Sequence, residues 1–95
     1  MSSGAGSLHF MTNGGTPAYS ISKVAINALT RILAAEVRNT DILINAIDPG
    51  WVAIDMGGRG GRPVEEGTRG IVGAATLPDN GPSGGFFYDG KSAPW

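Results

Sequence analysis

A long segment with helical periodicity, residues 17–38, limits the folds open to this chain. Thr16 suits the N-cap position and Pro17 suits the first helical position, where its missing N–H has no intrahelical partner to lose. A helix that is apolar on more than one face must pack on two sides, so we expect a sheet on one side and a helix on the other. The apolar residues recurring at helical spacing are Ile21, Val24, Ala25, Ala28, Leu29, Ile32, Leu33, Ala35 and Val37.

A short apolar run, residues 42–47, follows the predicted helix after a polar break at residues 39–41. Its length and β-branched content are those of a strand, and its near-continuous apolarity is typical of a strand buried on both faces of a parallel sheet. The serine pair near the chain start suggests the end of a preceding strand. Strand, helix and strand together predict a β-α-β unit with a right-handed crossover, and therefore an α/β fold in one small domain.

The second half of the chain alternates glycine-rich loops with two further elements. Pro63 and the acidic residues after it open a helix predicted for residues 63–77, and a last strand is predicted for residues 85–88. The loop at residues 57–62 lacks the features of a phosphate-binding loop, so we interpret it as a flexible substrate lid. We expect the terminal Trp95 to pack on a surface of the protein.

The composition excludes several classes of function. The net charge is -1 and the seven basic residues are scattered, so we expect no nucleic-acid partner and no membrane-surface partner. The chain has no cysteine and a single histidine, which argues against a metal site. Without a long apolar run or a signal-peptide pattern at its start, the chain is expected to be soluble and cytoplasmic.

Tyr19 and Lys23 are the strongest chemical feature of the sequence. They lie four residues apart at the start of the predicted helix, so they share one face, one turn apart. An ammonium beside a phenol stabilises the phenolate, which makes such a pair suitable for general acid and base catalysis. We therefore predict that Tyr19 donates and accepts a proton.

Four landmarks in fixed order resemble the short-chain dehydrogenase/reductase family. The resemblance covers essentially all 95 residues, but it corresponds to the carboxyl-terminal portion of the family's domain. It implies the carboxyl-terminal part of a doubly wound Rossmann-type parallel sheet, with residues 1–95 as a partial NAD(P)-binding domain that lacks the amino-terminal dinucleotide-binding unit. The closing residues look most like bacterial carbonyl-reductase-type members. The landmarks are Met1-Ser2-Ser3-Gly4, Tyr19-Ser20-Ile21-Ser22-Lys23 with the helix after it, Ile44 to Val52, and Gly84 to Gly90.

The resemblance implies a catalytic role for three residues. Tyr19 would protonate the developing alkoxide, and Lys23 would assist Tyr19 and hold the nicotinamide ribose. Ser3 would polarise the substrate carbonyl, with Ser2 as the fallback. The implied activity is hydride transfer between NAD or NADP and a small-molecule carbonyl or alcohol.

The resemblance also implies a cofactor-binding turn after the second strand. Pro49 and Gly50 would shape the nicotinamide pocket, and the main chain of Val52 would bond the carboxamide. Tyr19 and Lys23 would also contact the nicotinamide half of the cofactor. Trp51 and Ile54 complete the predicted cofactor contacts, although the family often has threonine at the position of Ile54. In the family the helix that matches residues 17–38 commonly packs against its counterpart in a second subunit, so we expect a homo-oligomer.

Two alternatives accompany this interpretation. A hydrolase triad of Ser3, His9 and Asp48 is conceivable, but no nucleophile elbow surrounds Ser3, and His9 is better placed as a loop residue lining the substrate cleft. The second alternative is an inactive truncated remnant, or a gene fragment with a mis-called start, acting at most as an oligomerising module. Because the pyrophosphate-binding glycine turn is not in this chain, we expect the isolated chain to lack activity.

Overall fold

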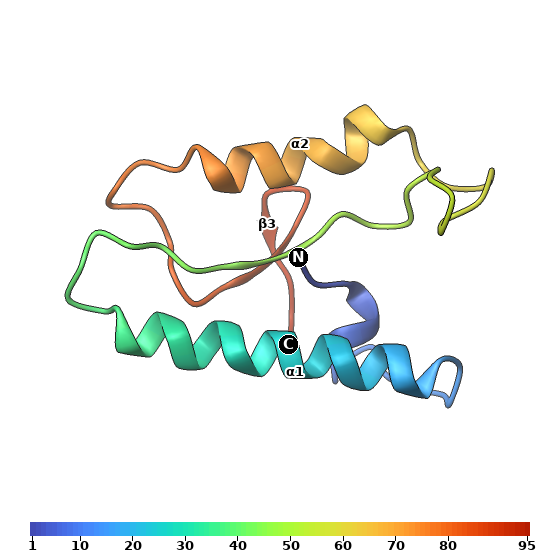
Figure 1. Ribbon diagram of the computed structural model, residues 1–95, viewed down its shortest axis with the longest axis horizontal. Coiled ribbons are helices and arrows are strands. Elements are labelled where there is room, and N and C mark those ends of the chain that lie inside the picture. The colour runs from blue at the N-terminus through green and yellow to red at the C-terminus, as the bar shows by residue number, and fades with distance from the viewer.

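The computed structural model describes all 95 residues and places two helices on opposite sides of a small sheet (Figure 1). The helices are α1 (Pro17–Glu36) and α2 (Val64–Ala75), and a short 3-10 helix, η1 (Gly4–Gly6), precedes them. The sheet consists of β1 (Ala46–Asp48), β2 (Phe86–Tyr88) and β3 (Lys91–Ser92), in the order β1-β2-β3. Neither α1 nor α2 combines the length and the hydropathy that crossing a lipid bilayer requires.

The sheet has a parallel pair and an antiparallel edge. β1 and β2 are parallel, with Ala46 opposite Phe86, whereas β3 returns antiparallel to β2 after a turn at Asp89 and Gly90. Residues 1–3 form no strand, but the Ser2 N–H donates to the Ile47 carbonyl at 2.8 Å, so the chain start still runs beside β1. The expected β-α-β unit is therefore only partly formed, and β3 was not predicted.

The strands are shorter than the sequence predicts, while the helices differ by one or two residues at their ends. In place of a strand over residues 42–47, Ile44 N–H donates to the Ser83 hydroxyl at 3.0 Å, and Asn45 bonds Pro82 and Gly85 through its side chain. Two backbone bonds join the same segments, from the Gly84 N–H to the Ile44 carbonyl at 2.7 Å and from the Ala46 N–H to the Gly85 carbonyl at 2.9 Å. Polar side chains therefore supply only part of the pairing ahead of β1. Thr16 precedes α1 as predicted, but its side chain makes no capping hydrogen bond.

The apolar core is small and is centred on the sheet. Its buried hydrophobic residues are Ala46, Ile47 and Phe86. Trp95 stacks on Phe86 with ring centroids 5.5 Å apart, and the Arg31 guanidinium lies 5.6 Å from the Trp95 ring centroid. The terminal aromatic therefore packs on the protein as predicted, between the core and helix α1.

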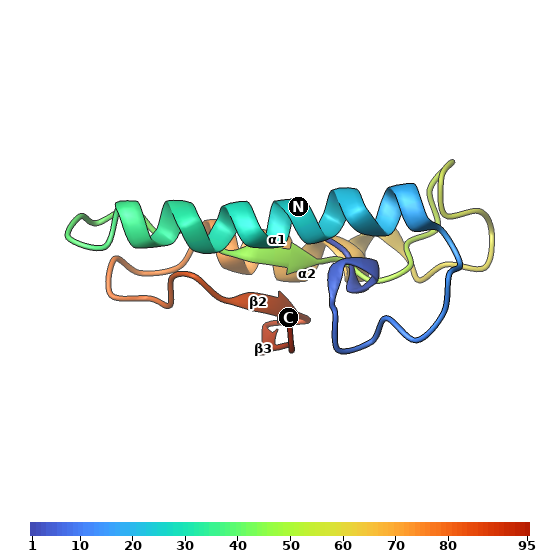
Figure 2. The ribbon, with the colours of Figure 1, turned by 90° about the horizontal axis from the view of Figure 1, so that it is seen from below.

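Helix α1 is attached to the chain start by buried polar groups. The Ser2 hydroxyl donates to Asn27 Oδ1 at 2.5 Å, and Asn27 Nδ2 donates to the Gly6 carbonyl at 3.0 Å. The buried residues of α1 are Asn27 and Thr30, whereas its apolar residues Ile32 and Leu29 are more than half exposed. The most buried residues of α1 are therefore polar, and the second side that we expected a helix to cover is open (Figure 2).

Replacing Asn27 with alanine should destabilise the chain by about 1–3 kcal/mol, because the Ser2 hydroxyl and the Gly6 carbonyl would lose their shared partner. Urea unfolding followed by circular dichroism, at one fixed protein concentration, measures the effect. Asn39→Ala is the control, since Asn39 is exposed, and it should change stability by less than about 0.5 kcal/mol. Equal stability of the two variants would contradict the anchoring role of Asn27.

Candidate functional site

Tyr19 and Lys23 lie together in the first turns of α1. The Lys23 Nζ is 5.4 Å from the centroid of the Tyr19 ring, so the ammonium and the phenol share one face of the helix. Tyr19 is 40% exposed, which leaves its ring accessible, while Lys23 is half-buried. The predicted placement on one face is the placement found in the structure.

The two serines near the chain start differ in their surroundings. Ser2 is buried, and its hydroxyl hydrogen is committed to Asn27. Ser3 is half-buried and caps η1: its Oγ accepts from the Ala5 N–H at 3.2 Å, and its own O–H donates to no acceptor in the chain. A hydroxyl carries one donor, so Ser3 retains the capacity to donate to another molecule and Ser2 does not.

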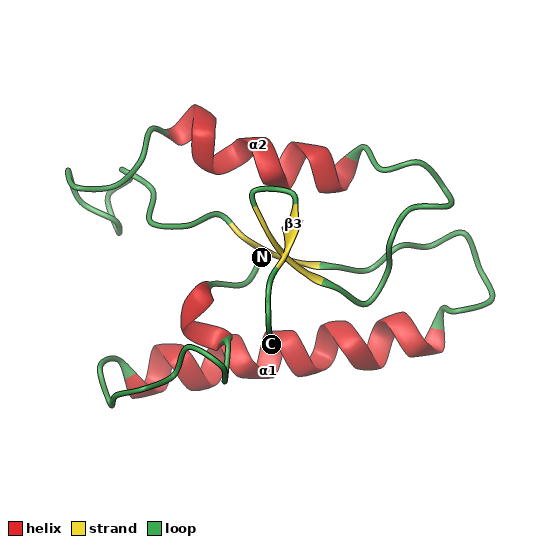
Figure 3. Ribbon diagram, turned by 180° about the vertical axis from the view of Figure 1, so that it is seen from behind, coloured by secondary structure: helices red, strands yellow, loops and turns green.

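Helix η1 lies against α1, and the two serines that precede it, Ser2 and Ser3, form with η1 the serine segment (Figure 3). A Cβ built on Gly6 would lie 2.8 Å from the main-chain carbon of Lys23 and 2.9 Å from its oxygen. At the other end of η1, a Cβ on Gly4 would lie 3.0 Å from Asp48 Oδ2, at the carboxyl end of β1. The segment that carries Ser3 is therefore packed between the Tyr19–Lys23 helix and the end of the sheet.

The predicted cofactor turn follows β1 directly. Asp48 Oδ1 accepts from the Gly50 N–H at 2.8 Å, and Gly50 has φ 72°, a conformation that favours glycine. Val52 is half-buried, and its N–H donates to no acceptor in the chain. Trp51 is largely exposed, with its indole N–H donating to the Gly57 carbonyl, and Ile54 is also exposed. The turn thus presents a free main-chain N–H at Val52, which can donate to a carboxamide oxygen.

The hydrolase triad considered above is not formed. His9 is exposed and packs edge-on against Phe10, with ring centroids 5.0 Å apart. Asp48 uses its carboxylate to bond Gly50, and no hydrogen bond joins Ser3, His9 and Asp48. Serine hydrolase chemistry needs such bonds to activate the nucleophile, so this arrangement does not support it.

Two cavities adjoin the serine segment. One of about 170 Å³ is lined by the loop after η1 and by the start of α1, including Thr16 and Ser20. The other, of about 530 Å³, lies at the carboxyl end of the sheet and is lined by Asp48, Tyr88 and Lys91 among others. Gly4, the residue after Ser3, and Phe10 line both cavities. A third cavity, of about 410 Å³, lies between α2 and the sheet.

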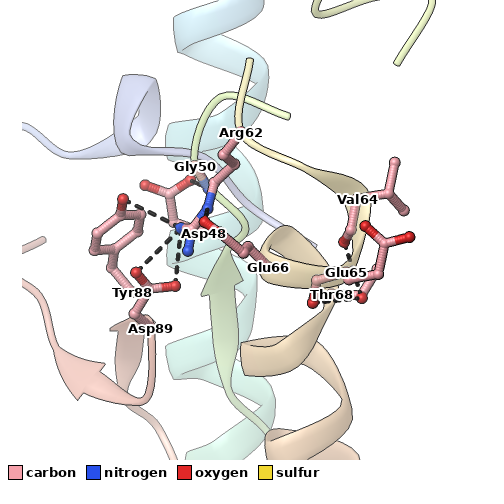
Figure 4. Close-up of polar contacts among 9 residues, drawn as sticks. All are labelled: Asp48, Gly50, Arg62, Val64, Glu65, Glu66, Thr68, Tyr88 and Asp89. Carbon is pink, nitrogen blue, oxygen red and sulfur yellow. Dashed lines mark hydrogen bonds and ion pairs between the residues drawn. The ribbon is translucent and has the colours of Figure 1, made fainter. Parts of the chain in front are cut away.

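Arg62 belongs to a polar cluster that the sequence did not predict. Its guanidinium bonds both carboxylate oxygens of Asp89 and the Tyr88 hydroxyl, and it pairs with Glu66 of α2 (Figure 4). The hydrogen bond and the charge of Asp89 raise the pKa of Arg62. Arg62 and Asp89 are far apart in the sequence, and a lone arginine among glycines carries no pattern that would have identified the pair.

Comparison with known proteins identifies the family. A protein-family model described as short chain dehydrogenase matches residues 1–62. The chain belongs to the short-chain dehydrogenase family. It is 41% identical over 85 residues to carbonyl reductase [NADPH] 1 of Mus musculus, covering 82% of this chain and 31% of the mouse protein. The resemblance to carbonyl-reductase-type members is thereby confirmed.

Solved structures of other family members contain the same fold. The carbonyl reductase Sniffer of Drosophila melanogaster is 34% identical, with a TM-score of 0.87, over 100% of this chain and 39% of that one. The NADPH-bound carbonyl reductase from chicken fatty liver is 34% identical, with a TM-score of 0.82, over 99% of this chain and 40% of that one. This chain thus has the predicted Rossmann-type α/β fold of its family. It spans less than half the length of these relatives.

Gly6→Ala should disturb the packing of η1 on α1, because the new Cβ would overlap main-chain atoms of Lys23 that cannot rotate away. Overpacking of this kind costs about 1–3 kcal/mol, which chemical denaturation measures. Gly14→Ala is the matched control in the same loop region, since a Cβ there meets nothing within 4 Å. If both substitutions leave stability unchanged, the close approach of Gly6 to Lys23 is refuted.

Proposed function

We propose that Tyr19, Lys23 and Ser3 form the catalytic site of an NAD(P)-dependent oxidoreductase. The reaction is hydride transfer between the nicotinamide and a small-molecule carbonyl or alcohol. The observation that carries this proposal is the pairing of Tyr19 with Lys23 on α1, with the Ser3 segment packed against the same helix. Residues 1–95 would form the carboxyl-terminal portion of an NAD(P)-binding domain, which agrees with their coverage of 31% of the mouse relative.

Proton transfer in the proposed reaction belongs to the Tyr19 hydroxyl. As a carbonyl is reduced, its oxygen gains negative charge, and Tyr19 donates its proton to that oxygen. The Lys23 ammonium favours the phenolate that this step leaves behind. The Ser3 O–H donates to the same carbonyl oxygen, which polarises the bond and fixes the substrate in place. In alcohol oxidation the same groups act in reverse.

The turn after β1 fits the nicotinamide half of the cofactor. The free N–H of Val52 suits a carboxamide oxygen, and Gly50 and Pro49 would set the path of the chain that leads to it. Trp51 and Ile54 would contribute apolar contact. When bound, the nicotinamide supplies or accepts the hydride. The names of the mouse and chicken carbonyl reductases carry NADPH, which supports NADP over NAD as the cofactor.

Tyr19→Phe should lower kcat by about 10²- to 10⁴-fold, because the phenyl ring keeps the packing and removes the proton. We would measure this in a chimera in which the 82% of this chain that aligns with mouse carbonyl reductase replaces the matching 31% of that protein. The cofactor affinity should change little, since Tyr19 acts mainly on the reacting oxygen. Ser22→Ala, on the exposed side of the same turn, is the control and should keep the parent rate. A Tyr19→Phe chimera that retains more than about a tenth of that rate excludes Tyr19 as the acid.

We also propose that the chain forms a homo-oligomer through α1. The observation behind this is a stripe of exposed apolar residues along one face of the helix, with Ile21, Leu29 and Ile32 respectively 68%, 51% and 59% exposed. Contiguous apolar surface of this kind is typical of association surfaces. A second copy presenting the same stripe would bury both faces in a two-fold arrangement.

The chain should sediment as a dimer or larger species at micromolar concentration, and the double variant Leu29→Lys/Ile32→Lys should sediment as a monomer. Two lysines in the stripe would place like charges opposite each other across the interface. Val72→Lys is the control, because Val72 is equally exposed but lies on α2. A compact wild-type monomer would exclude association through this helix.

A further inference from the structure

Arg62 joins three segments at the carboxyl end of the sheet. Its Nη1 donates to Asp89 Oδ1 at 2.9 Å and Oδ2 at 3.1 Å, and to the Tyr88 hydroxyl at 3.3 Å. Its Nε lies 3.7 Å from Glu66 Oε2, in the first turn of α2. Figure 4 shows these groups converging beside Gly50. One side chain therefore connects the end of β2, the start of α2 and the turn after β1.

The main chain of Arg62 holds the loop that follows this turn. The Arg62 N–H donates to the Trp51 carbonyl at 2.7 Å, and the Arg62 carbonyl accepts from the Ala53 N–H at 2.9 Å. These two bonds form an isolated parallel bridge on either side of Val52. The orientation of the free Val52 N–H is thus fixed by the residue whose side chain is tied to Asp89.

The side-chain cluster also packs directly on Gly50. A Cβ built on Gly50 would lie 3.0 Å from the Tyr88 ring and 3.3 Å from Arg62 Nη1. Asp89 has φ 48°, in the left-handed region that is unfavourable for residues other than glycine, although less so for aspartate than for most. Such a conformation persists where the surroundings fix it, and here the ion pair with the largely shielded Arg62 side chain does so.

We propose that Arg62 and Asp89 form a clasp that positions the main chain of Gly50–Val52 and thereby sets the affinity for the nicotinamide half of the cofactor. Arg62 is a positioning residue in this proposal, because it acts through the turn and transfers no proton. The effect on cofactor affinity rests on the function proposed above, whereas the positioning of the turn does not.

Amide hydrogen exchange in the 95-residue chain tests the positioning directly. Arg62→Ala and Asp89→Asn should each accelerate exchange in residues 50–62 by about tenfold or more, while exchange in α1 stays unchanged and shows that the fold is retained. The double variant should exchange no faster than either single variant, since both remove one shared interaction. Arg59→Ala is the matched control, because Arg59 is exposed in the same loop and has no ion pair. Unchanged exchange in Arg62→Ala would overturn the clasp.

Steady-state kinetics in the chimera test the consequence for the cofactor. Arg62→Ala should raise the KM for NADPH about tenfold and change kcat by less than about threefold, and Arg62→Lys, which keeps a cation near Asp89, should recover part of the loss. Faster exchange with an unaltered KM would overturn the link to the cofactor. If Tyr19→Phe retains activity while Arg62→Ala still accelerates exchange, the proposed catalytic site fails and the positioning role of the clasp stands.

Discussion

The close approach of Gly6 to the main chain of Lys23 is the constraint on which the candidate site depends. Because Gly6 has no side chain, η1 comes within contact distance of the α1 backbone, and Asn27 bonds both ends of this short segment through Ser2 and the Gly6 carbonyl. Ser2 in turn donates its N–H to Ile47 of β1. A continuous set of contacts therefore runs from the sheet through the serine pair to α1, and it fixes Ser3 relative to Tyr19 and Lys23.

The features that the sequence predicted are those with local causes. The start of α1 follows from Pro17 and the spacing of apolar residues, and the shared face of Tyr19 and Lys23 follows from helical geometry. The short β1 was not predictable, because it depends on side-chain bonds from Asn45 to residues about forty positions away. The sequence also could not predict the different surroundings of Ser2 and Ser3, because the two adjacent serines differ only through the hydrogen bond that Ser2 makes to Asn27 in the folded chain.

The burial pattern of α1 explains how a chain with so small a core can favour association. Only nine of the 95 residues are buried, and α1 buries Asn27 and Thr30 while leaving Leu29 and Ile32 open. A net hydrogen bond contributes about 1 kcal/mol, whereas full burial of a leucine or isoleucine side chain contributes about 1.5–3 kcal/mol. The buried polar residues thus orient the helix. Burying its exposed apolar side chains in an interface would stabilise it more than these polar contacts do.

Asp48 lies between the two halves of the candidate site. One of its carboxylate oxygens faces Gly4 of η1 and the other accepts from the Gly50 N–H, so Asp48 links the segment that carries Ser3 to the turn after β1. Arg62, Tyr88 and Asp89 act on the far side of that turn and touch neither Tyr19 nor Lys23. A change in this cluster moves Gly50 and Val52, while η1 stays held by Gly6 and Asn27. If Tyr19 and the turn after β1 act as proposed, cofactor affinity and the rate of proton transfer would therefore respond to separate substitutions.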